Sequence, residues 1–184
     1  MIISVRKFVL CVCCALLCLS SCVRPEQVDV LIVGGGASGI SAGIQCARMG
    51  VPAMIVEETP WVGGMLTAAG VSCIDGNYNL QSGIFGEFAD SLARRYGGWE
   101  ALQTGWVSYI NFEPQVGQEV LTNMAEGCEL LEVRRETMML DVARKEGKWV
   151  VLFKSAEGRK SKVAANILID GTELGDVAKA CGVE

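Results

Sequence analysis

The stretch DVLIVGGGASGISAGIQCARMGVPAMIVEE, from Asp29 to Glu58, constrains the fold of this 184-residue chain more than any other feature. Its apolar start, DVLIV, predicts a strand covered on both faces, as in a parallel sheet. Residues 37–49 predict a helix with one apolar face, and AMIV at 53–56 predicts a second buried strand. Strand, helix and strand within about 30 residues are typical of a βαβ unit.

Three glycines in the pattern G-x-G-x-x-G separate the first strand from the helix. Gly34 permits a tight turn, Gly36 lets a pyrophosphate approach the backbone, and Gly39 allows the helix to lie close to the sheet. Ala37 and Ser38 lie at the start of the helix, where unpaired N–H groups attract anions and the serine hydroxyl adds a donor. The sequence therefore predicts a diphosphate cradle at this turn.

Glu57 lies 23 positions after Gly34, at the end of the second strand. A carboxylate there can accept hydrogen bonds from the ribose hydroxyls of an adenosine, which favours an unmodified 2′-hydroxyl over a 2′-phosphate. A glycine pattern alone is weak evidence, since glycine turns occur in many loops. The order of strand, turn, helix, strand and acid predicts dinucleotide binding and leaves open which dinucleotide is bound.

The rest of the chain predicts two helices, a strand and an antiparallel meander. One helix ends at Gly97, a second begins at Pro114 and ends near Gly127, and CELLEV predicts the strand. The runs TMMLDVA, KWVVLFKS and KVAANILID are separated by short turn-like segments, which favours a meander over another helical crossover. We therefore expect an α/β fold, a Rossmann-like parallel sheet with an antiparallel β-meander.

Two later motifs extend the dinucleotide pattern: WVGGM, with Gly63, Gly64 and Met65, and LIDGTELGDVAKACGV, with Gly175 and Asp176. Together with GGMLTAAGVS, DGNYNLQSGIFGEF and GWVSYINFEPQVG, they resemble bacterial FAD-dependent oxidoreductases of the glutathione-reductase-like class, over most of the chain from residue 29 onward. The resemblance implies FAD as cofactor, with the glycine pair near its diphosphate and flavin and the glycine–aspartate turn beside it. It implies hydride transfer from a small-molecule substrate, and identifies neither that substrate nor a catalytic residue.

Enzymes of this class continue well beyond the length of the present chain with a substrate domain and a segment that covers the flavin. The resemblance therefore predicts that residues 29–184 form an FAD-binding Rossmann-like domain that is incomplete at its C-terminus, with the substrate domain absent. A truncated or split gene would explain this, and a separately encoded C-terminal part is then an expected partner. Two other interpretations stay open: a non-catalytic tethered remnant or binding module, and an NAD-dependent dehydrogenase.

Residues 1–21 have the features of an export signal. Arg6 and Lys7 precede an apolar run over 8–19, which is too short for a hydrocarbon core that needs about 20 helical residues. The run ends in LSSC, which resembles the bacterial lipoprotein signal box with Cys22 as the lipid-modified residue. We expect residues 22–28 to form a tether and the chain to be lipid-anchored in the bacterial cell envelope, on the periplasmic or outer-membrane side; an ordinary signal with an incidental cysteine is the alternative.

Composition and charge argue against several classes of function. Hydrophobic residues make up 51% of the chain, which indicates a globular or membrane-associated protein. Without residues 1–21, the remaining 14 basic and 21 acidic residues give a net charge of −7, so nucleic acid is not an expected partner. The chain has no histidine and no C-x-x-C pair, so no metal site is expected.

The remaining cysteines are expected to be buried free thiols, with a disulfide as the alternative: Cys46, Cys73, Cys128 and Cys181.

Overall fold

The computed structural model describes residues 24–75, 79 and 81–183. The signal peptide over 1–21 and the lipidation of Cys22 lie outside the described residues and stay predictions. Among the residues described, no helix has the length and apolar character needed to cross a membrane.

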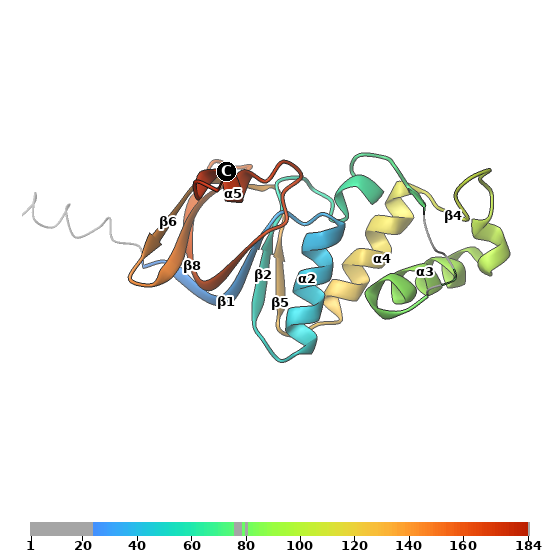
Figure 1. Ribbon diagram of the computed structural model, residues 1–184, viewed down its shortest axis with the longest axis horizontal. Helices are drawn as coiled ribbons and strands as arrows, with labels where there is room; N and C mark the ends of the chain where they lie inside the picture. The colour runs from blue at the N-terminus through green and yellow to red at the C-terminus, as the bar shows by residue number, and fades with distance from the viewer. Residues whose placement is uncertain (1–23, 76–78, 80, 184) are drawn as a thin grey trace, which may run out of the picture.

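A six-stranded sheet in the order β5-β2-β1-β8-β7-β6 forms the centre of the fold (Figure 1). β1 (Glu26–Val33) pairs in parallel with both β2 (Ala53–Val56) and β8 (Lys160–Asp170). β2 in turn pairs in parallel with β5 (Leu131–Arg134). The predicted Rossmann-like sheet is confirmed, and the carboxyl ends of these four strands meet at one edge, where ligands bind in open α/β sheets.

β1 begins earlier than the sequence indicates. Its first residue is Glu26, so three positions of the expected tether over residues 22–28 belong to the sheet. Their partners lie on β8, where Glu26 pairs with Val163 and Val28 with Ala165. A neighbouring strand therefore extends this segment, although its own residues, EQV, lack the apolar character of DVLIV.

The antiparallel meander is confirmed. β6 (Thr137–Lys145) pairs with β7 (Lys148–Ser155), and β7 pairs with β8, antiparallel in both cases. Glu146 and Gly147 both have positive φ angles, 51° and 80°, in the tight turn between β6 and β7. β8 joins the two parts of the fold, because its first half pairs with β7 while the stretch from Val163 to Asp170 pairs with β1.

Three helices lie together on one side of the parallel strands (Figure 1). They are α2 (Ala37–Arg48), α4 (Pro114–Glu126) and α3 (Gly83–Tyr96). Each coincides with a predicted helix, and every helix end that was predicted agrees to within two residues. Glycine brings α2 close to the sheet, because a β-carbon on Gly43 would lie 2.5 Å from Ile55 Cδ1. A side chain there would push the helix off β2.

The two central parallel strands are buried on both faces over residues 30–33 of β1 and 53–56 of β2, as their continuous apolar runs predict. Val30 and Ile32 of β1 pack with the helices in one cluster, whereas Leu31 and Val33 pack with β7 in another. Phe153 of β7, 1% exposed, belongs to that second cluster, so the meander covers the face that helices leave uncovered.

Several short elements were not predicted. The connection after the glycine pair contains a 3-10 helix, η1 (Gly64–Leu66), and β3 (Cys73–Ile74), which pairs with β4 (Ile110–Asn111) in a separate two-stranded sheet. The others are a second 3-10 helix, η2 (Trp99–Leu102), and α5 (Asp176–Ala180). Elements of two to five residues are too short for periodicity to identify them.

The expectation of buried thiols was wrong for Cys181, which is exposed at the end of α5. Cys46, Cys73 and Cys128 are half-buried, and all four thiols are free. Cys46 and Cys128 pack against the core under the helices, as small hydrophobic residues do. Across the described part of the chain, no group of three or more metal-ligating side chains comes together.

Candidate dinucleotide site

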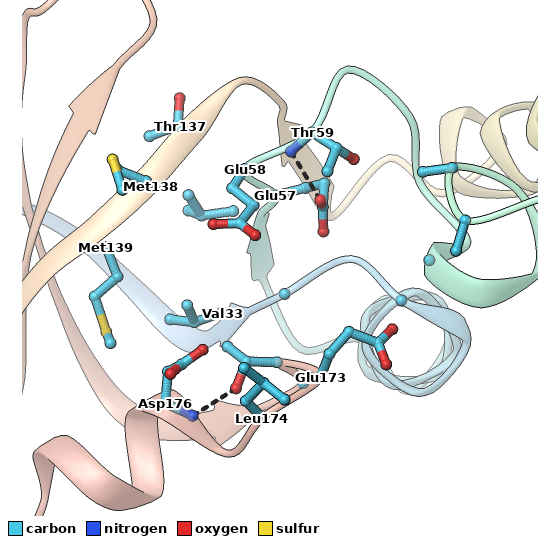
Figure 2. A pocket seen from close by; sticks show the side chains of 18 of the residues that line it. Val33, Glu57, Glu58, Thr59, Thr137, Met138, Met139, Glu173, Leu174 and Asp176 are labelled. Carbon is cyan, nitrogen blue, oxygen red and sulfur yellow. Dashed lines mark hydrogen bonds between the residues drawn. The ribbon is translucent and has the colours of Figure 1, made fainter.

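A pocket of about 800 Å³ lies at the carboxyl edge of the sheet (Figure 2). Its walls come from four segments far apart in the sequence: the turn after β1, the end of β2 with η1, the start of β6, and the segment after β8. The volume falls within the range of about 300–1,000 Å³ for small-molecule and cofactor sites. The topology thus assembles a ligand site where the sheet predicts one.

The turn between β1 and α2 forms one wall, and its glycines are needed for different reasons. Gly34 has a φ of 95°, and a β-carbon on it would overlap the backbone of Gly171 after β8. Gly39 packs against the carbonyl oxygen of Gly34 itself, so any side chain there would separate helix and turn. Gly36 has an ordinary φ of −61°, so its backbone does not require glycine. It lines the pocket, where the absence of a side chain leaves space for a ligand.

The N-terminus of α2 supplies backbone donors to this wall. Its first hydrogen bond runs from the Ile40 N–H to the Gly36 carbonyl oxygen, at 2.9 Å. The N–H groups of Ala37, Ser38 and Gly39 precede that bond and have no partner within the helix. No side chain caps the helix and its first turn contains no acidic residue, so its partial positive charge is available to an anion.

The glycine pair of WVGGM lies directly beside the turn. Gly63 forms a parallel bridge with Gly36, and its N–H donates to the Gly35 carbonyl oxygen at 2.8 Å. A β-carbon on Gly64 would lie 3.0 Å from the Gly36 α-carbon. Two segments separated by 27 positions in the sequence therefore form one side-chain-free surface.

Glu57 lies directly after β2, lines the pocket and is 7% exposed. Two backbone groups fix its carboxylate: the Gly35 N–H donates to Oε2 at 2.6 Å. The Thr59 N–H donates to Oε1 at 2.8 Å, as Figure 2 shows. Each carboxylate oxygen has further lone pairs, so both can still accept a hydroxyl. Glu57 thus holds the glycine turn in place while it presents acceptors to the pocket.

The segment after β8 forms a wall beside the β1–α2 turn, and Asp170 organises it. Oδ1 of Asp170 accepts from the Thr172 N–H and hydroxyl at 3.0 and 2.6 Å, and Oδ2 accepts from the Ala178 N–H at 2.8 Å. The Thr172 hydroxyl oxygen in turn accepts from the Asp176 N–H at 2.8 Å (Figure 2). Burial raises the pKa of Asp170, but the hydrogen bonds from Thr172, Ala178 and Val177 outweigh it and lower that pKa.

The start of β6 contributes an apolar wall that sequence reasoning missed. Thr137, Met138 and Met139 line the pocket, and Figure 2 places Met139 on the side of Val33 and Met138 beside Thr137. The register of β6 against β7 shifts after Met139, which interrupts the regular alternation of side chains. Only the fold brings these residues to the site, because the meander gives no local sign that its first strand reaches a ligand.

Most predicted site residues gather at the pocket. Six line it: Gly34, Gly36, Glu57, Gly64, Met65 and Asp176. The other five lie within the same turns and are not part of the lining: Ala37, Ser38, Gly39, Gly63 and Gly175. The four charged residues of the lining are all acidic, Glu57, Glu58, Glu173 and Asp176, and no lysine or arginine is found among the lining residues that the structure describes.

Comparison with known proteins identifies the class to which this arrangement belongs. A family model described as FAD dependent oxidoreductase matches residues 29–184. The chain belongs to this family. FAD is therefore the cofactor to be tested against the site.

Known relatives are much longer than this chain. NADH:fumarate oxidoreductase of Klebsiella pneumoniae is 34% identical over 149 residues, which cover 80% of this chain and 15% of that protein. Mitochondrial dihydrolipoyl dehydrogenase of Dictyostelium discoideum is 35% identical over 72 residues, 39% of this chain and 14% of that protein. The present chain thus corresponds to a small part of these relatives.

Solved structures share the fold at low identity. A flavoprotein/dehydrogenase from Cytophaga hutchinsonii matches with a TM-score of 0.64 and 17% identity, over 85% of this chain and 42% of that one. The flavin-dependent monooxygenase PieE, solved with FAD and substrate, matches with a TM-score of 0.55 and 18% identity, over 86% and 33%. These matches support the Rossmann-like FAD-binding fold.

The residues present fit the adenosine diphosphate half of FAD. The side-chain-free surface of Gly36 and Gly64 adjoins the uncapped end of α2, which offers donors to a diphosphate. The fixed carboxylate of Glu57 offers acceptors to ribose hydroxyls, and the methionines of β6 offer an apolar surface to adenine. The cradle depends on backbone groups, which explains how an anion can bind without a basic side chain.

Proposed function

We propose that this chain binds FAD through the β1–α2 turn, as the cofactor-binding part of an FAD-dependent oxidoreductase. The observation that carries the proposal is the contact of Gly36 with Gly64 beside the uncapped N-terminus of α2. The family match supports the choice of FAD over NAD. When bound, FAD supplies the acceptor for a hydride from the substrate.

The residues of this chain would bind and orient the cofactor. The N–H groups at residues 37–39 would bind the diphosphate, and Glu57 would accept the ribose hydroxyls. Asp176 lies on the wall formed by the segment after β8, where the hydrogen bonds of Asp170 and Thr172 hold its backbone in place. Such fixed groups bind without reorganisation, which is the contribution a protein makes in cofactor chemistry.

Substitution of Gly36 by valine tests the proposal. The side chain would enter the pocket beside Glu173, while the φ of −61° at this position suits valine. Gly36→Val should therefore fold and lose saturable FAD binding, measured by flavin fluorescence with the full chain in detergent. Gly127→Val is the matched control, because Gly127 is exposed, has a φ of −69° and lies outside the pocket lining.

Two outcomes would refute the proposal. If Gly36→Val binds FAD as well as the unmodified chain does, the turn is not the diphosphate site. If the unmodified chain binds NAD and fails to bind FAD, the cofactor assignment is wrong and the chain is an NAD-binding domain.

The location of the protein is a separate part of the proposal. We place the chain on a bacterial envelope membrane through lipid attached at Cys22, supported by the apolar run and the LSSC motif. Several acyl chains anchor a protein firmly, whereas one binds only marginally. Cys22→Ala should abolish incorporation of labelled fatty acid in cells and release the protein from membranes; retention of both would contradict lipidation.

A further inference from the structure

Glu173 is a charged side chain close to the proposed diphosphate site. A β-carbon built on Gly64 would lie 2.7 Å from Glu173 Oε1, and one built on Gly36 would lie 3.4 Å from the same oxygen. Figure 2 shows this side chain projecting from the segment after β8 toward the end of α2. A carboxylate therefore lies where the two glycines leave space.

This carboxylate has no partner that would explain its position. Within the part of the chain that the structure describes, Glu173 forms no hydrogen bond or ion pair, and its side chain is exposed. The nearby positive field comes from the N-terminus of α2, which no side chain caps. An anionic side chain next to such a helix end interacts favourably with the same backbone charge that would attract a phosphate.

We propose that Glu173 weakens dinucleotide affinity by competing with the diphosphate for the N-terminus of α2. This inference rests on the proposed function, because it assumes a diphosphate at the β1–α2 turn. A carboxylate beside Gly36 and Gly64 would repel a diphosphate bound at the same turn, so Glu173 would have to turn away for the ligand to bind. Since the side chain is exposed and unpaired, it can turn toward solvent without breaking a bond within the protein.

Charge, rather than bulk, is the property to test. Glu173→Gln keeps the shape of the side chain and removes its charge, so it should tighten FAD binding about tenfold, the size expected for one like charge in a partly solvated site. The same gain should appear for ADP, which carries the diphosphate. Adenosine, which has no phosphate, should gain less than about twofold, since it lacks the charge that the carboxylate repels.

A control separates this local effect from the change in net charge. Glu129 is exposed in the connection before β5, at the amino end of the parallel strands and opposite the pocket. Glu129→Gln removes the same charge and should leave all three affinities within about twofold, because solvent screens a charge at that distance. The affinities are measured by titration calorimetry on the full chain in detergent, at one fixed ionic strength.

The possible results are distinguishable. Unchanged or weaker FAD and ADP binding by Glu173→Gln, while the unmodified chain binds FAD, would overturn the role of Glu173 and leave the proposed function standing. An equal gain for adenosine would also overturn it, because the effect would not depend on phosphate charge. If neither form binds FAD or ADP, the proposed function and this inference both fail.

Discussion

Two turns lie side by side at the pocket, and they are built in opposite ways. The turn after β1 contains glycines and no charged side chain, and it is shaped by the contact of Gly34 with Gly171 and of Gly39 with Gly34. The turn after β8 is held by acceptor side chains, because Asp170 and Thr172 bind its N–H groups. The first turn can therefore be disrupted by adding an atom, and the second by removing an acceptor.

Among the changes that compare the two turns, the largest effect is expected from a methyl group at Gly39. In Gly39→Ala the new β-carbon would overlap the Gly34 carbonyl oxygen and approach Ile32 Cγ2 to 3.4 Å. Because both contacts lie within packed backbone and core, α2 must move away from the turn, at a cost of about 1–3 kcal/mol. FAD affinity should fall at least about tenfold, since the N–H donors move with the helix. Denaturant unfolding and FAD titration measure the two effects.

Gly127→Ala is the control for this prediction. Gly127 follows α4 with a φ of −69°, and a β-carbon there would lie 3.4 Å from the nearest oxygen, on Asn123. The free energy of unfolding of Gly127→Ala should change by no more than about 0.5 kcal/mol, and the FAD affinity of this variant should not change. Equal behaviour of the two variants would mean that the turn after β1 is not sterically fixed.

The difference between the two turns also explains what the sequence could predict. Gly34, Gly36 and Gly39 act locally, so their spacing between a strand and a helix was enough to predict the turn. The meander was likewise predicted from short apolar runs and turn-like segments, because hairpin pairing is local. The position of Met138 and Met139 in the pocket wall was not predicted, since only the fold brings the start of β6 next to the end of β2.

The turn after β8 was predicted in part. Gly175 and Asp176 were identified by resemblance, whereas Asp170, which fixes their conformation, was not. An aspartate at the end of a strand has many ordinary roles, and its partner Ala178 is eight positions away. The position of Glu173 also depends on a contact between distant segments, because β8 must lie beside β1 before the carboxylate can reach α2.

An intermediate effect is expected when the second turn loses an acceptor. Asp170→Asn replaces one carboxylate oxygen by an NH₂ group, which then faces a backbone N–H of Thr172 or Ala178. Because Asp170 is exposed, water can partly replace the lost acceptor, so the cost should be about 1 kcal/mol, and α5 should loosen with it. FAD affinity should fall less than in Gly39→Ala, because the donors of α2 stay in place.

Asp141→Asn is the control for the second turn. Asp141 is an exposed aspartate of β6, and among the residues described its carboxylate accepts only from the adjacent Val142 N–H, at 2.9 Å. Denaturant unfolding should show a change of no more than about 0.5 kcal/mol for this variant. If Asp170→Asn is equally mild, hydrogen bonds from Asp170 do not determine the conformation of the turn.

The smallest effect is expected from acid, and it concerns only the second turn. The hydrogen bonds that Asp170 accepts lower its pKa in the folded protein, so its charged form stabilises the fold above its ordinary pKa of 3.8. That contribution is lost as the pH falls from about 4 through the lowered pKa, because protonation removes an acceptor.

The difference in unfolding free energy between the unmodified chain and Asp170→Asn should therefore be constant from pH 7 to about 5 and shrink below about 4. Glu57, Glu173 and Asp176 line the same pocket and are present in both proteins, so comparing the two curves largely cancels their effects. The glycine turn has no titratable group, and the difference between the unmodified chain and Gly39→Ala should stay flat over the same range. If the two differences shrink in parallel, the acid effect is a general loss of stability and the contrast between the turns is not electrostatic.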